Sequence, residues 1–162
     1  MKNAVSVNLL LAALLGSGCG GNATPPEGAT ADQDTIRQTL LVYYQDMSDR
    51  AWARYRTHFW DNATITTVWQ QGGDSSRRVH VITIDEFVRD TPNGPDSKPV
   101  FEEKMLGSEI AITGNIAVVW ARYEAKFGSR DSLSHWQGTD VFTLLRFGGS
   151  WKIVSLVFEA DG

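Results

Sequence analysis

Apolar residues recur at helical spacing near the start of the region that is expected to fold. They stand three or four positions apart, which places their side chains on one face of a helix. These positions are Ile36, Leu40, Tyr43 and Met47. Asp32 or Asp34 is suited to cap the first turn. The pattern therefore predicts an amphipathic helix that begins near residue 34.

Two further helices are predicted after the first. Ser48-Asp49 interrupts the first helix and caps a second, in which three aromatic residues share one face. They are Trp52, Tyr55 and Phe59. Asp61-Asn62 then predicts a turn. Thr83 and Glu86 have the spacing of a capping box, which predicts a short third helix.

The remaining pattern is typical of strands. Residues 63–69 are rich in β-branched side chains, and apolar runs separated by glycine-containing turns fill the second half of the chain. The predicted runs are 101–105, 110–113, 116–127, 135–147 and 151–159, with turns at 114–115, 128–132 and 148–149. Helices followed by strands indicate an α+β fold, with the helices packed on one face of a curved antiparallel sheet.

The N-terminal residues have a different character. Lys2 precedes an apolar run at 4–15, which is shorter than the ~20 residues of a membrane-spanning helix. Small residues follow, and then Cys19, the single cysteine of the chain. The segment resembles a bacterial lipoprotein signal, although Gly16 stands where that pattern prefers an aliphatic residue. The resemblance implies cleavage after residue 18 and a lipid on Cys19; the alternative is an ordinary cleaved signal that leaves a free thiol.

The predicted organisation is therefore a signal peptide at 1–18, a flexible tether at 19–33 and one domain at 34–162. The tether is rich in Gly, Pro, Thr and Ala, and it has no periodic apolar residues. The expected location is the bacterial cell envelope. Gly20, in place of an aspartate after the cysteine, favours the periplasmic side of the outer membrane.

Composition and motifs exclude several classes of function. The formal net charge is −4, whereas nucleic-acid binding depends on a basic surface, so no nucleic-acid partner is expected. His58, His80 and His135 have no HxH or HExxH spacing, and we interpret them as solvated or capping residues. This spacing does not favour a metal site, and no metal is expected. The chain has no GxSxG motif for Ser-His-Asp catalysis and no GxGxxG or P-loop for a nucleotide, and no cofactor is expected.

Two short motifs carry a resemblance to a known family. Phe59-Trp60-Asp61-Asn62-Ala63-Thr64 and Gly149-Ser150-Trp151-Lys152-Ile153-Val154, together with the order of elements, look like the NTF2-like superfamily. The SnoaL-like and lumazine-binding-like groups are the most similar, over residues 34–160. The resemblance implies a cone-shaped sheet wrapped around helices, with a pocket at its open end. Members include isomerases, dehydratases, polyketide cyclases and proteins without demonstrated activity.

The ketosteroid isomerases of that superfamily allow a residue-by-residue comparison. Their oxyanion-binding tyrosine aligns with Tyr43, but their general-base aspartate aligns with Thr67, which cannot accept a proton near neutral pH. Their second acid falls near Thr143, and regular strand alternation places Asp140 on the opposite face. Steroid isomerase chemistry is therefore not expected, and the pocket is predicted to have no group that exchanges protons.

Aromatic residues are abundant around the expected pocket. Plain core packing is one explanation, and a lining for a flat or apolar ligand, with Tyr43 and Thr67 as polar contacts, is the other. The pocket candidates are Tyr43, Trp52, Tyr55, Thr67, Trp69, Trp120, Tyr123 and Phe158.

Three functional hypotheses follow. The first is a lipid-anchored, non-catalytic domain that binds a small apolar ligand or an envelope partner. The second is an isomerase, dehydratase or cyclase that uses Asp140 or Glu124 with Tyr43. The third is a purely structural envelope protein.

The runs 116–120 and 151–158 are apolar on both faces, which predicts that a second subunit covers the outer face of the sheet in a homodimer.

Overall fold

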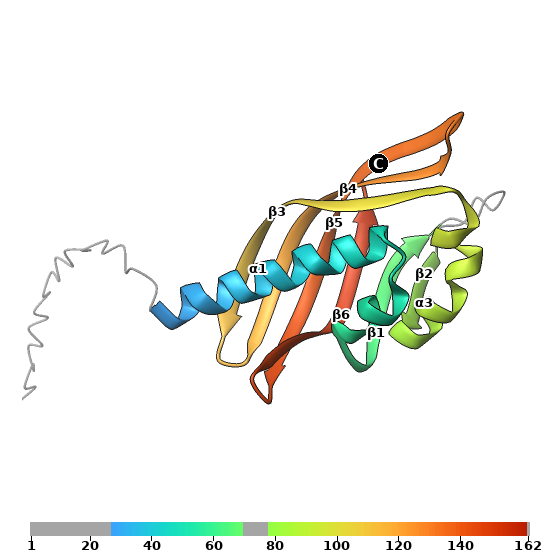
Figure 1. Cartoon of the computed structure of the whole chain (residues 1–162). Helices are drawn as coiled ribbons and strands as arrows, with labels where there is room; N and C mark the ends of the chain where they lie inside the picture. The colour runs from blue at the N-terminus through green and yellow to red at the C-terminus, as the bar shows by residue number, and fades with distance from the viewer. Residues whose placement is uncertain (1–26, 70–77, 162) are drawn as a thin grey trace, which may run out of the picture.

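The computed structural model describes residues 27–69 and 78–161 (Figure 1). The predicted signal, Cys19 and most of the predicted tether lie outside the described residues. The helices are α1 (Glu27–Ser48), α2 (Trp52–Thr57) and α3 (Ile84–Asp90), followed by the 3₁₀ turns η1 (Thr91–Asn93) and η2 (Pro95–Ser97). The strands are β1 (Phe59–Trp69), β2 (Arg78–Thr83), β3 (Val100–Thr113), β4 (Ile116–Ser129), β5 (Ser132–Phe147) and β6 (Ser150–Ala160).

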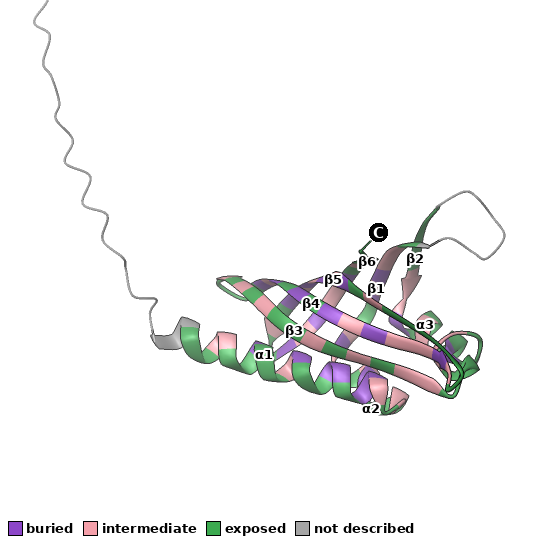
Figure 2. Ribbon diagram, turned by 90° about the horizontal axis from the view of Figure 1, so that it is seen from above, coloured by how far each residue is buried: buried purple, intermediate pink, exposed green. Residues whose placement is uncertain are grey.

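The six strands form one curved sheet in the order β2-β1-β6-β5-β4-β3. Neighbouring strands are antiparallel except β1 and β6, which run parallel. Helix α1 lies across one face of this sheet, while α2 and α3 gather at the end near β1 and β2 (Figure 1). Viewed from above, the buried side of α1 faces the sheet (Figure 2). The predicted α+β architecture is confirmed.

Helix α1 begins earlier than its apolar pattern predicts. It starts at Glu27, so residues 27–33 of the predicted tether are helical and neither Asp32 nor Asp34 is its cap. Asp32 instead makes tertiary contacts that the sequence does not reveal. It pairs with Arg146 at 2.8 Å and accepts a hydrogen bond from the Trp151 indole at 3.2 Å, which fixes the early turns of α1 to the sheet.

The capping box of α3 is confirmed. The Thr83 hydroxyl accepts a hydrogen bond from the Glu86 backbone N–H at 3.2 Å, and the Glu86 carboxylate accepts one from the Thr83 N–H at 2.7 Å. This reciprocal pair satisfies two donors at the start of the helix. The predicted turns at Gly114-Asn115 and Gly148-Gly149 are also present, and the three glycines adopt the positive φ that such turns favour.

The turn predicted at Asp61-Asn62 and the break predicted between the strands 101–105 and 110–113 are both bulges within longer strands. Asp61-Asn62 lies within β1, where Asn62 has a φ of 61° and the register with β6 shifts between Phe59 and Thr64. Helix α2 is correspondingly shorter than predicted, because Phe59 already belongs to β1. The two runs predicted at 101–113 form the single strand β3, which is bulged between Met105 and Gly107.

The core lies between α1 and the inner face of the sheet. Helix α1 contributes buried residues at its predicted apolar positions, and β4, β5 and β6 contribute alternate residues. Fully buried examples are Ile36, Leu40, Tyr43, Val119, Phe142, Leu144 and Ile153. This packing leaves the end of the sheet near α2 and α3 unfilled.

Candidate functional site

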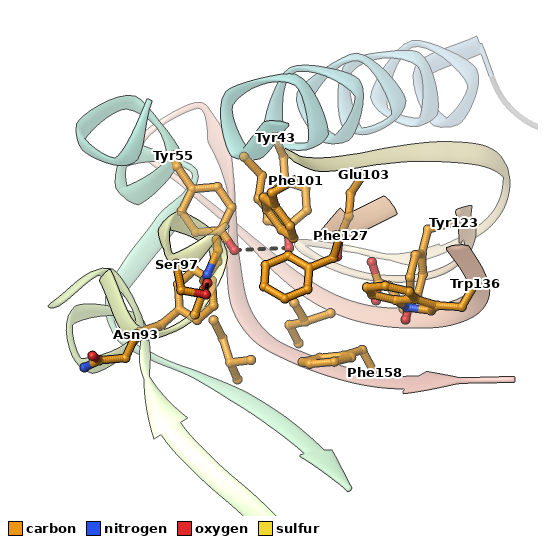
Figure 3. A pocket seen from close by; sticks show the side chains of 17 residues that line it. Tyr43, Tyr55, Asn93, Ser97, Phe101, Glu103, Tyr123, Phe127, Trp136 and Phe158 are labelled. Atoms are coloured by element: carbon orange, nitrogen blue, oxygen red, sulfur yellow. Dashed lines mark hydrogen bonds between the residues drawn. The ribbon is translucent and has the colours of Figure 1, made fainter. Parts of the chain in front are cut away.

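A cavity of about 310 Å³ occupies this unfilled end of the sheet (Figure 3). Its lining comes from every helix, from η1 and η2, and from all the strands except β2. Eight lining residues are aromatic: Tyr43, Tyr55, Phe87, Phe101, Tyr123, Phe127, Trp136 and Phe158. The exposed residues Asn93 and Ser97 mark the side on which η1 and η2 border it.

Two tyrosines place hydroxyl groups in the cavity. The Tyr55 hydroxyl donates a hydrogen bond to the Tyr43 hydroxyl over 3.2 Å, and the two ring centroids are 5.0 Å apart (Figure 3). Both residues are buried. Burial raises the pKa of both phenols, so they remain protonated near neutral pH. The pair can therefore offer hydrogen bonds but no negative charge.

Asp140 brings a carboxyl group from β5 into the lining. It is only 4% exposed, and its Oδ2 accepts a hydrogen bond from the Tyr44 hydroxyl. Within the described part of the chain, Oδ1 has no hydrogen-bond partner. Burial raises the pKa of Asp140 to about 7, against the lowering effect of the Tyr44 hydrogen bond. The cavity therefore contains a group that is poised to gain or lose a proton near neutral pH.

Glu103 supplies a second carboxyl group from β3. Ser48 holds its backbone, since the Ser48 hydroxyl donates to the Glu103 carbonyl and accepts from the Glu103 N–H, each over 2.8 Å. Burial first, and the negative charge of Asp140 second, raise the pKa of Glu103 well above its ordinary value. Among the side chains that the structure describes, none forms a hydrogen bond or an ion pair with the Glu103 carboxyl group. Two carboxyl groups thus share one aromatic cavity.

Tyr123 depends on a glycine in the neighbouring strand. Tyr123 of β4 is in register with Gly138 of β5. A Cβ atom at position 138 would lie 2.4 Å from both the Tyr123 hydroxyl and the Glu159 carbonyl oxygen. Only glycine accommodates this approach without displacing the tyrosine from the cavity. Burial also raises the pKa of Tyr123, which keeps its hydroxyl protonated.

The turn η2 is tied to Arg50, between α1 and α2, and to Trp52, the first residue of α2. Arg50 donates to the Lys98 carbonyl at 2.7 Å and to the Pro95 carbonyl at 3.3 Å, and it pairs with Asp96 at 3.3 Å. The Trp52 indole donates to Asp96 at 2.8 Å. These contacts hold one border of the cavity in place.

A second polar cluster joins α1 to α2 but lies outside the cavity lining. Asp46 is 3% exposed and contacts Arg54 at 2.8 Å and His58 at 2.9 Å. Burial raises the pKa of Asp46, but the hydrogen bonds from His58 and Arg54 outweigh it and give a net lowering. His58 is the C-cap residue of α2, which agrees with its interpretation as a capping residue, and its side chain is in addition a partner of the buried Asp46 carboxylate. We assign this cluster a structural role.

The structure brings together only part of the predicted pocket. Tyr43, Tyr55, Tyr123 and Phe158 line the cavity. Trp52 contacts Phe87 and Asp96 near its border, and Thr67 does not line it. Trp120 lies on the opposite face of the sheet and is 47% exposed, so its assignment to the pocket is wrong. The Trp69 side chain lies outside the described residues.

The prediction of a cavity without a proton-exchanging group is also wrong. Asp140, Phe142 and Leu144 are the buried residues of their stretch of β5, so the aligned position Thr143 lies on the outer face. The prediction that Asp140 and Thr143 lie on opposite faces of the sheet is correct. The face of Asp140, however, is the one that lines the cavity. Glu124 is not in the cavity, because it pairs with Lys104 at 2.6 Å and faces His135.

Glu103 was not among the predicted site residues. The sequence does contain a signal for it, because strand alternation puts Glu103 on the same face as Phe101 and Met105. An acidic residue between two apolar ones on a buried face is unusual and points to a functional or paired group.

The described residues contain neither a cluster of metal-binding side chains nor a helix suited to span a membrane. No set of three or more His, Cys, Asp or Glu side chains in residues 27–69 and 78–161 is arranged to hold a metal ion. None of the helices in those ranges has the length and apolar character needed to cross a membrane.

Comparison with known proteins identifies the family. The family model described as "Putative lumazine-binding" matches residues 31–159, and the chain therefore belongs to this family. None of the curated proteins matches the sequence.

Solved structures confirm the NTF2-like fold. An NTF2-like protein of unknown function from Shewanella baltica OS155 is 22% identical, with a TM-score of 0.59 over 82% of this chain and 96% of that one. A "Putative Scytalone Dehydratase" from Novosphingobium aromaticivorans is 11% identical, with a TM-score of 0.66 over 83% and 87%. The β subunit of a putative aromatic-ring-hydroxylating dioxygenase from the same species is 15% identical, with a TM-score of 0.67 over 84% and 93%.

Proposed function

We propose that the cavity binds a small, flat, largely apolar molecule. The observation that carries this proposal is the aromatic lining of a cavity of about 310 Å³, a volume within the ~300–1,000 Å³ that is usual for small-molecule sites. Planar rings favour stacked or edge-on contacts with a planar ligand. The family description refers to lumazine binding, and the name of one structural neighbour refers to aromatic rings, which is consistent with such a ligand.

Trp136 makes binding measurable, since it lies in the lining and its fluorescence should change when a ligand stacks nearby. Lumazine and 1-naphthylmethanol are suitable flat probes. Phe158→Ala removes a partly buried lining ring and should weaken binding about tenfold or more. Leu106→Ala, at an exposed position of β3, is the matched control and should bind like the wild type. Absence of binding by every flat probe to the folded protein would contradict the proposal.

A second candidate function is acid–base catalysis of the isomerase, dehydratase or cyclase type. The observation that favours it is Asp140, a buried cavity residue with a pKa of about 7, in the same cavity as the Tyr43–Tyr55 pair of hydrogen-bond donors. A general base works best when its pKa lies near the operating pH. In such a reaction Asp140 would take a proton from carbon, and a tyrosine hydroxyl would stabilise the oxygen on which charge develops.

The ring opening of 5-nitrobenzisoxazole tests this candidate, because it requires a flat substrate and one proton abstraction. The catalysed rate should rise through pH 7 as Asp140 ionises. Asp140→Asn should abolish the increase, whereas Glu124→Gln, which removes a carboxyl group outside the cavity, should leave it unchanged. Equal rates for Asp140→Asn and the wild type would leave ligand binding without catalysis as the proposed function.

We further propose that the domain is anchored by a lipid on Cys19 in the cell envelope, on the periplasmic side of the outer membrane. The support is the sequence alone: an apolar leader, small residues and a single cysteine at the predicted junction.

A further inference from the structure

The cavity combines two carboxyl groups with a complete absence of basic side chains. Asp140 and Glu103 are the ionisable acids of the lining, and no lysine, arginine or histidine is among the lining residues of the described chain. Buried carboxylates are normally paired with a cation or with several hydrogen-bond donors. Here Tyr44 supplies one donor to Asp140 Oδ2, while Oδ1 and the Glu103 carboxyl have no partner in the described ranges.

We infer that the ligand of this cavity is a flat aromatic molecule that carries an aliphatic amine, whose protonated nitrogen pairs with Asp140 and Glu103. This inference rests on the proposed binding function and adds the charge of the ligand to it. Its basis is the Oδ1 of the buried residue Asp140, which has no hydrogen-bond partner in the described ranges, together with the second carboxyl in the same cavity and the ring-lined walls.

The aromatic walls suit a cation as well as a flat ring. The π faces of tyrosine, tryptophan and phenylalanine carry partial negative charge and attract ammonium groups, most strongly where water is excluded. Tyr123, Phe127 and Trp136 belong to the same lining as the two acids. Rings can therefore enclose the flat body of the ligand while the carboxyl groups accept hydrogen bonds from its nitrogen.

The groups that face Asp140 give this preference a definite pH dependence. They come from α1, α2, β3 and β4, and each one is neutral or acidic. These groups are Tyr43, Tyr44, Tyr55, Glu103 and Tyr123. Among the described residues, no neighbouring cation therefore compensates the charge that Asp140 acquires as the pH rises through 7. A cationic ligand should bind more tightly at higher pH, and an anionic ligand more weakly.

Three probes of one shape separate charge from aromatic contact. These are 1-naphthylmethylamine, 1-naphthylmethanol and 1-naphthoate, and their binding to the full-length protein is measured by calorimetry at pH 5.5 and 8.5. At pH 8.5 the amine should bind at least about tenfold more tightly than the alcohol, as expected for a charge-assisted hydrogen bond. At pH 5.5 the two should converge, and the naphthoate should bind more weakly than the alcohol at both pH values.

Substitutions of single carboxyl groups test whether the preference for the amine over the alcohol comes from the cavity. Asp140→Asn and Glu103→Gln should each reduce the preference for the amine, with the larger loss in Asp140→Asn. Glu102→Gln removes a carboxyl on the opposite face of β3, where it pairs with Lys126, and should leave the preference unchanged. If Asp140→Asn does not fold, the release of protons when the wild type binds each probe near pH 6.5 gives a further test. Calorimetry measures this release from the difference in binding heat between two buffers that have different heats of protonation. The amine should release protons on binding and the alcohol should not.

The outcomes distinguish this inference from the proposed function. Binding of the alcohol as tightly as the amine at pH 8.5 would overturn the inference and leave the aromatic-ligand proposal intact. Absence of binding by all three probes would overturn both.

Discussion

Burial of the Asp140 carboxyl ties the stability of the fold to pH. Its pKa is about 7 in the folded chain, against about 3.9 for an unfolded aspartate. Between these values the folded state binds more protons than the unfolded state does. The contribution of Asp140 to the free energy of unfolding must therefore fall as the pH rises from 4 through 7.

Asp140→Asn should remove this dependence. The asparagine can still accept the Tyr44 hydrogen bond, and it carries no charge to desolvate at high pH. Its stability relative to the wild type should increase by on the order of 2–3 kcal/mol between pH 5 and pH 8. Urea unfolding at the two pH values measures this difference.

Glu124→Gln provides a control of opposite sign. The hydrogen bond from Lys104 lowers the pKa of Glu124, so its carboxylate stabilises the folded state at high pH rather than at low pH. The variant should therefore gain no stability relative to the wild type as the pH rises. A gain equal to that of Asp140→Asn would mean that the pH dependence does not come from the cavity.

The sequence could indicate some of the cavity residues and not others. Helical spacing identified Tyr43 because one face of α1 is consistently buried. Asp140 and Glu103 were harder to interpret, because acidic residues in strands are usually solvent-exposed. Their inward orientation follows from alternation with Phe142 and Phe101, which assigns the face only when the register and the bulges are known.

Helix α3 positions Phe87 in the cavity and is held by its capping box. Thr83→Ala should lower the free energy of unfolding by about 1 kcal/mol, because the Glu86 N–H loses its side-chain partner. Thr83→Ser keeps the hydroxyl and should cost much less. Thermal unfolding of the two variants measures the contrast, and equal destabilisation would show that the methyl group, not the hydrogen bond, is responsible.

Elements with a local chemical cause were predictable, and those set by distant contacts were not. The capping box and the glycine turns arise from a few adjacent residues, and both were predicted correctly. The bulge at Asn62 depends on pairing with β6, almost a hundred residues later in the chain. Likewise, the early start of α1 depends on Arg146 and Trp151, which no local pattern reveals.

The outer face of the sheet exposes apolar side chains across three adjacent strands. Ile116 and Leu145 are in register, and Val141 lies in register between Trp120 and Val157. All of these except Val141 are more than a third exposed. We therefore retain the prediction that a second copy of the chain covers this face, since burying it would remove a contiguous apolar surface from water.

Trp120→Glu should convert the predicted dimer to a monomer, because a charge would be placed in the middle of the apolar face. Light scattering at tens of micromolar measures the mass. Leu133→Glu is the control, since Leu133 is similarly exposed but lies at the far end of β5. A monomeric wild type at this concentration would contradict the prediction.

Attachment to a membrane is a prediction about the whole chain and rests on one residue. If Cys19 is lipidated after cleavage, Cys19→Ser should lose both the lipid and the membrane association of the full-length protein. The domain should remain folded, because Cys19 precedes the first described helix. Mass spectrometry of the N-terminal peptide and fractionation of cells that express the two forms measure these effects. An unmodified thiol on a cleaved wild-type chain would favour an ordinary secretory signal, in which case the cavity would serve a freely diffusing protein.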